Sequence, residues 1–335
     1  MGIRARGGIA AFLLLAILFA VPAQAEPLKI GVLRSIGSVL AFVAQDKNYF
    51  AAEGFTAELV FFDSAQPISV AVASGDIDVG VSGLTGSLYS LGGQGVLRII
   101  GGGAREVPGF KLQAYVASNK AYEAGLRHFK DFPGHSFGTS QIGAPGHYSL
   151  VLIAEKYGFD MGKVRVLPLQ SIPNIISAIA GGQADFAILP GVAAVPPVDR
   201  GDAKMIGWAG EESPYQLGAA FVAAKTIGER PAVVPRFLSA YRKAARDYHD
   251  AFADASETRR DGPEAPALLA IIAKSTGVTV EQAKLGIAWI DREERLDVKD
   301  ILRQIAWYKS QGMVKGEFDP AVIFDKASVV ALPER

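Results

Sequence analysis

The stretch SQIGAPGHYS, residues 140–149, gathers side chains that could bind a ligand or take part in catalysis. Its glycines let the backbone approach a ligand closely, and Pro145 suits the first turn of a helix. The free N–H groups and the positive end of that helix would favour an anion. His147 and Tyr148 could add hydrogen bonds and an aromatic wall. We expect this loop to form the lip of a ligand-binding cleft; the alternative is a tight turn with a surface histidine.

Two other motifs suggest enzymes, but their surroundings argue against catalysis. GHSFG at 134–138 matches the G-x-S-x-G nucleophile elbow, whose serine ends a strand just before a helix. Ser136 instead follows a Phe-Pro-Gly turn and begins a strand. GGGARE at 101–106 lacks the spacing of a phosphate-binding loop. Its Arg105, just beyond an apolar run, could meet an acidic ligand or form an ordinary ion pair.

Carboxylates, histidines and cysteines give no catalytic or metal site either. Asp78 and Asp185 lie in strand-like segments that follow a G-x-x-D turn, and we expect both to cap neighbouring backbone groups. The four histidines lack the spacing of metal ligands, and the chain contains no cysteine. We therefore expect no catalytic residue, no metal and no cofactor.

The composition and the first 25 residues are typical of an exported soluble protein. Arg4 and Arg6 precede an apolar run at 9–21, and Ala-Gln-Ala at 23–25 has the pattern of a cleavage site. The run is too short to span a bilayer, so we expect residues 1–25 to be a cleavable signal peptide that directs the chain to the periplasm. The balance of 34 basic and 34 acidic residues gives no case for a nucleic-acid partner.

An internal repeat organises the rest of the chain. A segment beginning at Leu28 and another beginning at His135 align without a gap at an offset of 107 residues. Each copy predicts the order strand, helix, strand, helix, strand. The predicted elements are 28–33, 39–52, 59–62, 67–74 and 77–81 in the first copy, and 137–139, 148–157, 164–167, 175–180 and 184–189 in the second. Alternating elements of this kind favour two α/β lobes with parallel sheets; the alternative is one continuous doubly wound sheet.

Two extended segments, 110–120 and 215–225, are expected to cross between the lobes. The chain beyond 229 is mostly helical by pattern and is expected to pack on the first lobe. Its clearest helix spans 236–252 and carries an apolar face. The predicted lobes are residues 26–113 with 217–335, and residues 114–216.

Ligands of parallel α/β sheets bind beyond the carboxyl ends of the strands. In the first copy these ends fall at 34–37, 63–67 and 82–85, and in the second at 141–147, 170–173 and 189–192. We expect the two sets of strand ends to face each other across a cleft.

Four segments in series resemble the solute-binding proteins of ABC importers, in the nitrate/sulfonate/taurine group of the thiamine-pyrimidine-synthase-like family. They are VLAFVAQDKNYFAAEGF, AVASGDIDVGVSG, FKDFPGHSFGTSQIGAPGHYSLVLIAEKYGF and IAGGQADFAILPG. Asn48 stands where that family usually has glycine, and His135 where it has lysine. The resemblance implies a two-lobed periplasmic-binding-protein fold of type II, in which each lobe is a mostly parallel sheet flanked by helices and two crossing strands join the lobes.

The same resemblance, carried over by position, implies a set of ligand contacts. These are Ser35, Ser64, Ser82, Thr85, Gly146, His147 and Tyr148, with Arg34, Gln66, Arg105 and Tyr215 as further candidates. The implied function is capture of a small organic anion by hinge closure; the candidates are sulfonates and carboxylates, aromatic ones included. A monomer of this kind delivers its ligand to an ABC permease and its ATPase in the inner membrane. The alternatives are an exported enzyme, for which only His147 offers acid–base chemistry, and a ligand-sensing protein.

Overall fold

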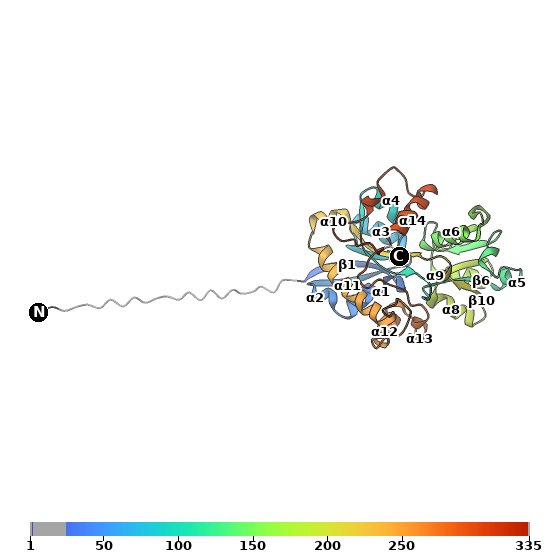
Figure 1. Ribbon diagram of the computed structural model, residues 1–335, viewed down its shortest axis with the longest axis horizontal. Helices are drawn as coiled ribbons and strands as arrows, with labels where there is room; N and C mark the ends of the chain where they lie inside the picture. Colours follow the sequence, from blue (N-terminus) through green and yellow to red (C-terminus); the bar gives the residue numbers. More distant parts are fainter. Residues whose placement is uncertain (1, 3–24, 334–335) are drawn as a thin grey trace.

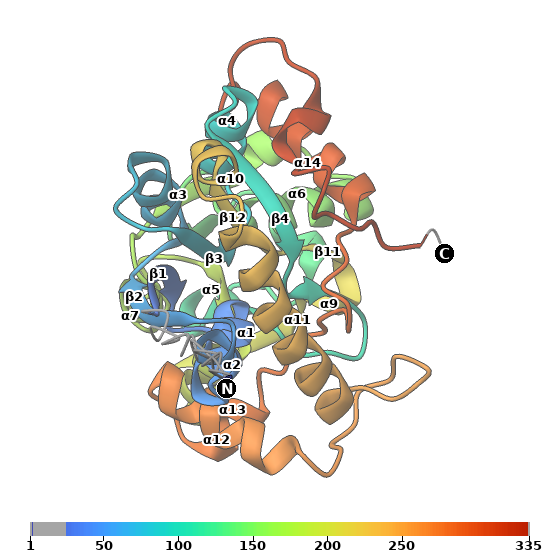
Figure 2. The same cartoon turned by 90° about the vertical axis from the view of Figure 1, so that its left-hand side faces the viewer.

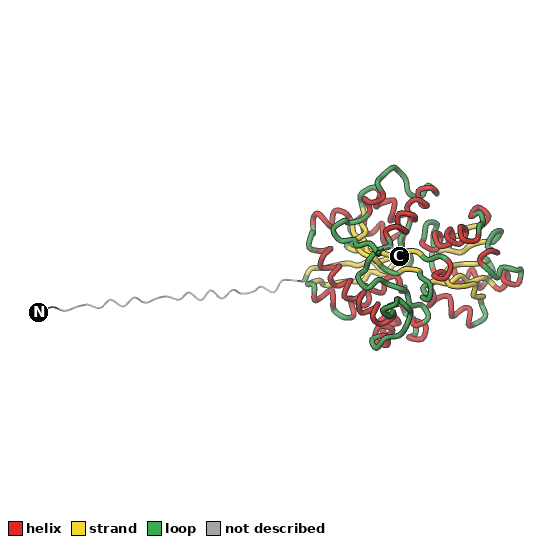
Figure 3. The backbone as a smooth tube through the Cα atoms, in the orientation of Figure 1, coloured by secondary structure: helices red, strands yellow, loops and turns green. Residues whose placement is uncertain are grey.

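The structure, a computed structural model, describes Gly2 and residues 25–333 of the 335-residue chain. The predicted signal peptide lies outside the described residues except for Gly2 and Ala25. Figure 1 shows two halves side by side, and Figure 3 shows that each half has strands inside and helices outside. We call these halves the first and the second lobe.

The first lobe is built on a five-stranded sheet with the order β2-β1-β3-β12-β4. Its β1 pairs parallel with β2 and β3, whereas β12 pairs antiparallel with β3 and β4. The strands are β1 (Glu26–Leu33), β2 (Phe55–Phe62), β3 (Val79–Gly83), β4 (Leu97–Gly102) and β12 (Gly218–Ala223).

The second lobe is built on a five-stranded sheet with the order β10-β6-β9-β7-β8. Here β7 pairs parallel with β8 and β9, and β6 pairs antiparallel with β9 and β10. The strands are β6 (Gln113–Ser118), β7 (Ser136–Thr139), β8 (Arg165–Pro168), β9 (Phe186–Pro190) and β10 (Ala203–Trp208).

The two sheets have the same topology, because β2-β1-β3-β12-β4 corresponds strand by strand to β8-β7-β9-β6-β10. In each sheet four strands share one direction and the fifth, β12 or β6, is reversed. These reversed strands are the two segments predicted to cross between the lobes. A short pair, β5 (Arg105–Glu106) with β11 (Tyr215–Gln216), lies where the chain passes between them. The predicted α/β architecture of two separate sheets is thus confirmed.

Helices cover both sheets. In the first lobe these include α1 (Val39–Asp46), α2 (Tyr49–Ala52), α3 (Ala65–Ser74), α4 (Gly86–Gly93), α10 (Ala224–Glu229), α11 (Val233–Phe252), α12 (Ala265–Thr276), α13 (Val280–Lys284) and α14 (Val298–Ser310). The second lobe has α5 (Asn119–Glu123), α6 (Pro145–Tyr157), α7 (Ile172–Ala180), α8 (Gly191–Asp199) and α9 (Ala209–Glu212). Short 3-10 turns lie at η1 (Ile36–Ser38), η2 (Phe129–Asp131), η3 (Met161–Lys163) and η4 (Pro320–Ile323).

Helix α11 illustrates how the sequence pattern fixes the packing. Its Phe237, Tyr241 and Tyr248 recur at helical spacing and are all buried, so this face packs on α1 and α2 (Figure 2). The predicted helix over 39–52 is divided because Asn48 adopts a left-handed conformation with φ of 59°. Asparagine tolerates this conformation better than most residues, which is why it can separate α1 from α2.

The two equivalent aspartates of the repeat cap equivalent backbone groups, as predicted. The backbone N–H of Lys29 donates to Asp78 Oδ2 at 2.8 Å, and that of Ser136 donates to Asp185 Oδ2 at 2.7 Å. Lys29 and Ser136 are themselves separated by the repeat offset. The repeat therefore preserves a hydrogen bond as well as an order of elements.

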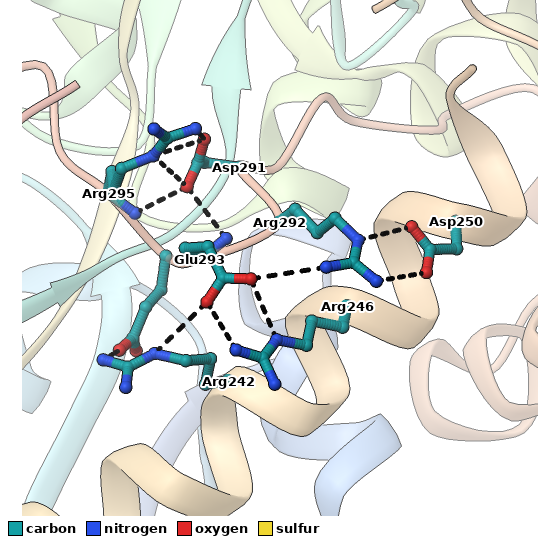
Figure 4. Close-up of polar contacts among 8 residues, drawn as sticks. Arg242, Arg246, Asp250, Asp291, Arg292, Glu293 and Arg295 are labelled. Atoms are coloured by element: carbon teal, nitrogen blue, oxygen red, sulfur yellow. Dashed lines mark hydrogen bonds and ion pairs between the residues drawn. The ribbon is translucent and has the colours of Figure 1, made fainter. Parts of the chain in front are cut away.

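Ion pairs between α11 and the loop at 291–295 hold the chain just before α14 (Figure 4). Arg246 binds Glu293 through two hydrogen bonds of 2.9 and 2.7 Å, and Arg292 Nε donates to Asp250 Oδ1 at 2.8 Å. Exposed pairs contribute little individually, but together they fix the loop against α11. None of the helices in the described part of the chain is long and apolar enough to cross a membrane.

Candidate ligand-binding cleft

A cavity of about 460 Å³ lies between the lobes, at the carboxyl ends of their strands. Both copies of the repeat contribute to its wall, as expected for strand ends that face each other. The residues that follow the parallel strands and line the cavity include Arg34, Ser35, Asp63, Ser64, Thr85, Ser140, Gln141, Ser171 and Val192.

These strand ends lead directly into helix N-termini, where unpaired backbone N–H groups favour an anion. Ser64, Thr85 and Ser171 are the N-cap residues of α3, α4 and α7. The Thr85 hydroxyl accepts a hydrogen bond from the Leu88 N–H at 3.2 Å and keeps its own proton to donate. Ser35 and Ser64 form no side-chain cap hydrogen bond. Their hydroxyls are therefore available to a ligand.

Charge in the cavity wall is confined to the first lobe. Among the described lining residues only Arg34 and Asp63 are charged. The guanidinium of Arg34 lies 4.0 Å from the centroid of the Phe61 ring, and it forms no ion pair with any described residue. The cavity wall therefore holds one cation, which lies against an aromatic ring, and one carboxylate, Asp63, with which it forms no direct ion pair.

The wall that the second lobe contributes is apolar apart from hydroxyl and amide groups. Its side chains come from α7, β9 and the start of α8, and the larger apolar ones are Ile172, Pro173, Ile175, Ile188, Pro190 and Val192. Gly146 belongs to this wall, and a Cβ added there would lie 2.4 Å from Ile188 Cγ2. The close approach of α6 to β9 therefore requires glycine.

Five of the predicted contacts line the cavity, namely Arg34, Ser35, Ser64, Thr85 and Gly146. Six do not, namely Gln66, Ser82, Arg105, His147, Tyr148 and Tyr215. Arg105 forms an ion pair with Asp297, which is the ordinary role weighed for it above. Gln66 lines a separate shallow groove with Val70 and Ile142. Ser82 is buried, and its hydroxyl has no hydrogen-bond partner.

His147 and Tyr148 turn away from the cavity toward α14. The Nδ1 atom of His147 accepts a hydrogen bond from the Gly143 N–H at 3.3 Å, and its ring meets the Trp307 ring edge-on. Burial lowers the pKa of His147 to about 4, so the imidazole is neutral at pH 7. Tyr148 donates its hydroxyl proton to Asp300 Oδ1 at 3.2 Å. Helical geometry explains the difference, because successive residues of a helix point about 100° apart, so that Gly146 faces the cavity while His147 and Tyr148 point to α14.

Several lining residues were not among the predicted contacts. Asp63, Gln141 and Ser171 fall within the predicted strand ends. The rule that ligands bind beyond the carboxyl ends of parallel strands could therefore have identified them. Gln113 gave no such signal, because it begins a crossing strand. Its side-chain oxygen accepts a hydrogen bond from the Tyr215 hydroxyl at 3.0 Å, so Tyr215 orients a lining residue without itself lining the cavity.

The lobes touch beside the cavity. The N–H of Gly86 in α4 donates to the carbonyl oxygen of Gly143 in the second lobe at 3.1 Å. A Cβ added at Gly83 would lie 2.7 Å from Pro145 Cγ, which shows how closely β3 approaches α6. Among the described residues, no three His, Cys, Asp or Glu side chains gather in a way that could hold a metal ion.

Known structures share this architecture at low sequence identity. The periplasmic aliphatic sulphonate-binding protein SsuA of Escherichia coli matches with a TM-score of 0.68 and 14% identity, over 89% of this chain and 97% of the other. The alkanesulfonate-binding protein SsuA of Xanthomonas axonopodis pv. citri, solved with bound MOPS, matches with 0.67 and 18% identity, over 92% and 100%. The desulfurization enzyme DSZB matches with 0.62 and 15% identity, over 89% and 96%. These likenesses establish the periplasmic-binding-protein fold.

Sequence comparison defines the family. No curated protein sequence matches the chain. The family model described as NMT1/THI5 like matches residues 37–254, which include both sheets apart from β1. The match covers more than half of the chain, with all of the second copy of the repeat and the first copy from residue 37 onward, and on this basis the chain belongs to the NMT1/THI5-like family.

Proposed function

We propose that this protein is the periplasmic solute-binding component of an ABC importer and that it captures a small organic anion between its lobes. The observation that carries this proposal is the Arg34 guanidinium, which forms no ion pair with a described residue, in a cavity whose wall otherwise consists of hydroxyls, amides, helix N-termini, apolar side chains and the single carboxylate of Asp63. The anionic group would bind Arg34 and the hydroxyls of Ser35 and Ser64 on the first lobe. The apolar body of the ligand would be covered by the second lobe.

The energetics of such a complex are ordinary. Charge-assisted hydrogen bonds are roughly twice as strong as neutral ones. A micromolar Kd corresponds to a binding free energy of about −8 kcal/mol, which several such bonds together with apolar contact can supply. A ligand that contacts both lobes favours the closed arrangement, which is how hinged binding proteins couple binding to shape. A sulfonate or carboxylate with an apolar body fits this wall better than nitrate, which would leave the apolar wall without a partner.

The proposal extends to organisation and partners. We propose lobes of residues 26–113 with 217–335 and of residues 114–216, which agree with the distribution of β1–β4 and β12 and of β6–β10 between the sheets. The protein acts as a monomer in the periplasm and presents its closed form to an inner-membrane permease driven by an ATPase. It requires no cofactor, metal or nucleic acid.

Ligand screening by thermal shift tests the function. MOPS, taurine, benzenesulfonate, benzoate and nitrate are each added to the mature protein, and a ligand present at 100 times its Kd raises the stability by about 2.7 kcal/mol. We expect a shift with at least one organic acid and none with nitrate. The absence of a shift with every organic acid would contradict the proposal.

The role of Arg34 is tested with the acid that gives the largest shift. Arg34→Gln removes a charge-assisted hydrogen bond, so we expect Kd to rise by about ten- to a hundredfold in isothermal titration. Arg260→Gln, at an exposed arginine that does not line the cavity, is the matched control and should leave Kd unchanged. Equal affinities of the two variants would remove Arg34 from the anion site.

An enzyme on the same scaffold is the second candidate, because the enzyme DSZB shares the fold. Catalysis by proton transfer needs an acid or base within hydrogen-bond reach of the ligand. His147 is turned toward Trp307 and away from the cavity, which leaves the Asp63 carboxylate as the one ionisable acid or base among the described lining residues, without a second such group to act with it. We therefore favour a binding protein, and mass spectrometry of the bound acid after prolonged incubation should recover it unchanged.

A further inference from the structure

Helix α14 lies at the junction of the lobes, next to α6 in both views (Figures 1 and 2). It packs on α4 of the first lobe and on β11, where the chain passes between the lobes. From there its side chains reach the second lobe. Arg303 forms an ion pair with Glu155 of α6, and the Tyr308 hydroxyl donates to the Ala144 carbonyl at 3.4 Å. The helix thus contacts both halves that must separate when the cleft opens.

Asp300 of α14 is held on the side of the first lobe through one carboxylate oxygen. The backbone N–H of Gln216 and the Nε2 atom of Gln304 each donate to Asp300 Oδ2 at 2.8 Å. Gln304 is held in turn, because its Oε1 accepts from the Tyr89 hydroxyl of α4 at 2.8 Å. Gln304 of α14 and Tyr89 of α4 tie Asp300 to the first lobe, Gln216 belongs to the segment that passes between the lobes, and Asp300 Oδ1 faces the second lobe.

Tyr148 of α6 supplies the partner from the second lobe. Its hydroxyl donates to Asp300 Oδ1 at 3.2 Å, and its side chain is 1% exposed. Its ring centroid lies 5.8 Å from that of Trp307 and 5.7 Å from that of Tyr215. It therefore packs in the core of the first lobe although its helix covers the sheet of the second. Any opening that moves α6 away from α14 must withdraw this ring and break this hydrogen bond.

We propose that Tyr148 and Asp300 form an interlobe latch that stabilises the closed cleft and sets ligand affinity without either residue touching the ligand. A hydrogen bond to a charged acceptor is worth enough that losing the hydroxyl shifts the ratio of closed to open forms by about tenfold or more. The statement about affinity rests on the proposed function, whereas the statement about closure holds with or without a ligand.

The closure is measured by distance between spin labels. The chain contains no cysteine, so Glu58→Cys in the first lobe and Ala180→Cys in the second, both at exposed positions, give two unique labelling sites. Pulsed electron resonance is applied to the ligand-free protein with and without Tyr148→Phe. In the parent we expect the distance between the spin labels to be mainly that of the closed form. In Tyr148→Phe we expect a larger fraction of molecules to show the distance of the open form. Asp300→Asn, a weaker acceptor of the same shape, should move this fraction in the same direction.

Tyr157→Phe is the matched control. It makes the same change on the same helix, and the hydroxyl it removes donates to Glu212 of the second lobe at 2.9 Å. We expect its distance distribution to equal that of the parent. A parent protein that shows only the open distance, or a Tyr148→Phe protein that is less stable to urea but keeps the parent distribution, would overturn the latch.

Affinity provides the second arm of the test. With an acid that binds the parent, Tyr148→Phe should raise Kd by about tenfold and Tyr157→Phe should not. If none of the organic acids bound, the proposed function would fail while the distance measurement would still decide the latch. The two failures are therefore distinguishable.

Discussion

At the scale of single residues, position along a strand or helix decides which polar groups reach the cleft. Arg34 and Arg105 both follow apolar strand-like runs, yet only Arg34 lines the cavity, because Asp297 binds Arg105. His147 lies one position beyond Gly146, and that rotation along α6 is enough to turn it toward Trp307. Sequence places such residues near an edge of the sheet but does not reveal a partner that lies far away in the chain.

The buried imidazole of His147 predicts a pH-dependent stability. Burial lowers its pKa to about 4 from an ordinary value of 6.5, so the unfolded chain binds the proton more tightly in this range. The folded state therefore loses stability as the pH falls from about 6.5, by roughly 3 kcal/mol at pH 4. We expect His147→Phe, which keeps a ring against Trp307, to remove this component.

Urea unfolding of both proteins at pH 7, 5.5 and 4.5 checks the prediction. Other groups titrate in the same window, so the quantity of interest is the difference between the two unfolding free energies. As the pH falls, the unfolding free energy of His147→Phe should rise relative to that of the parent. Parallel curves would show that His147 takes up its proton equally well in the folded protein.

At the scale of elements, most of the helices and strands could be predicted from the sequence, because the same order of elements occurs twice in the chain. The repeat predicts α3 and α7 and the strands β3 and β9 at equivalent positions, and the structure has them there. Local pattern is sufficient in these cases because each strand or helix buries one face against its own sheet. The pairing of β5 with β11 and the position of α14 could not be predicted, since both depend on contacts between distant segments and have no periodic signature.

The aspartate cap of the second sheet is a prediction at this scale. Asp185 accepts hydrogen bonds from both the backbone N–H and the hydroxyl of Ser136, each at 2.7 Å. We expect Asp185→Ala to lower the unfolding free energy by about 1–3 kcal/mol, because it leaves a strand N–H unpaired, and Ser136→Ala to cost about 1 kcal/mol. Chemical denaturation measures both. Asp199→Ala, on the last turn of α8, serves as control, and a cost equal to that of Asp185→Ala would contradict the capping role.

At the scale of the whole molecule, function depends on how closely the lobes approach. Gly83 and Gly143 lie at points of close contact, where backbone from one lobe meets backbone or proline from the other. At Gly83 the closed arrangement favours a small residue, whereas Gly143 also has a φ of 80°, which favours glycine within its own lobe. The sequence shows the glycines, but it does not show which of its 37 glycines lies at the junction.

Gly83→Ala is expected to hold the lobes apart. The added Cβ would lie 2.7 Å from Pro145 Cγ, and overpacking of this kind costs about 1–3 kcal/mol. Small-angle X-ray scattering should show a larger radius of gyration, and the Kd of any organic acid that binds the parent should rise by about tenfold. Gly37→Ala is the control for shape, because its Cβ would meet neighbours only at 3.5 and 3.7 Å. An unchanged radius of gyration in Gly83→Ala would show that the junction adapts.

The reversed strand of the first sheet has a consequence for the order in which the protein acquires its structure. All five strands of the second sheet lie within residues 113–208, whereas β12 of the first sheet follows at 218–223 and must insert between β3 and β4. A chain emerging from its amino end can therefore assemble the later half of the molecule before the earlier half is complete. Until then β3 and β4 have no strand between them, and their unpaired edges are open to premature association.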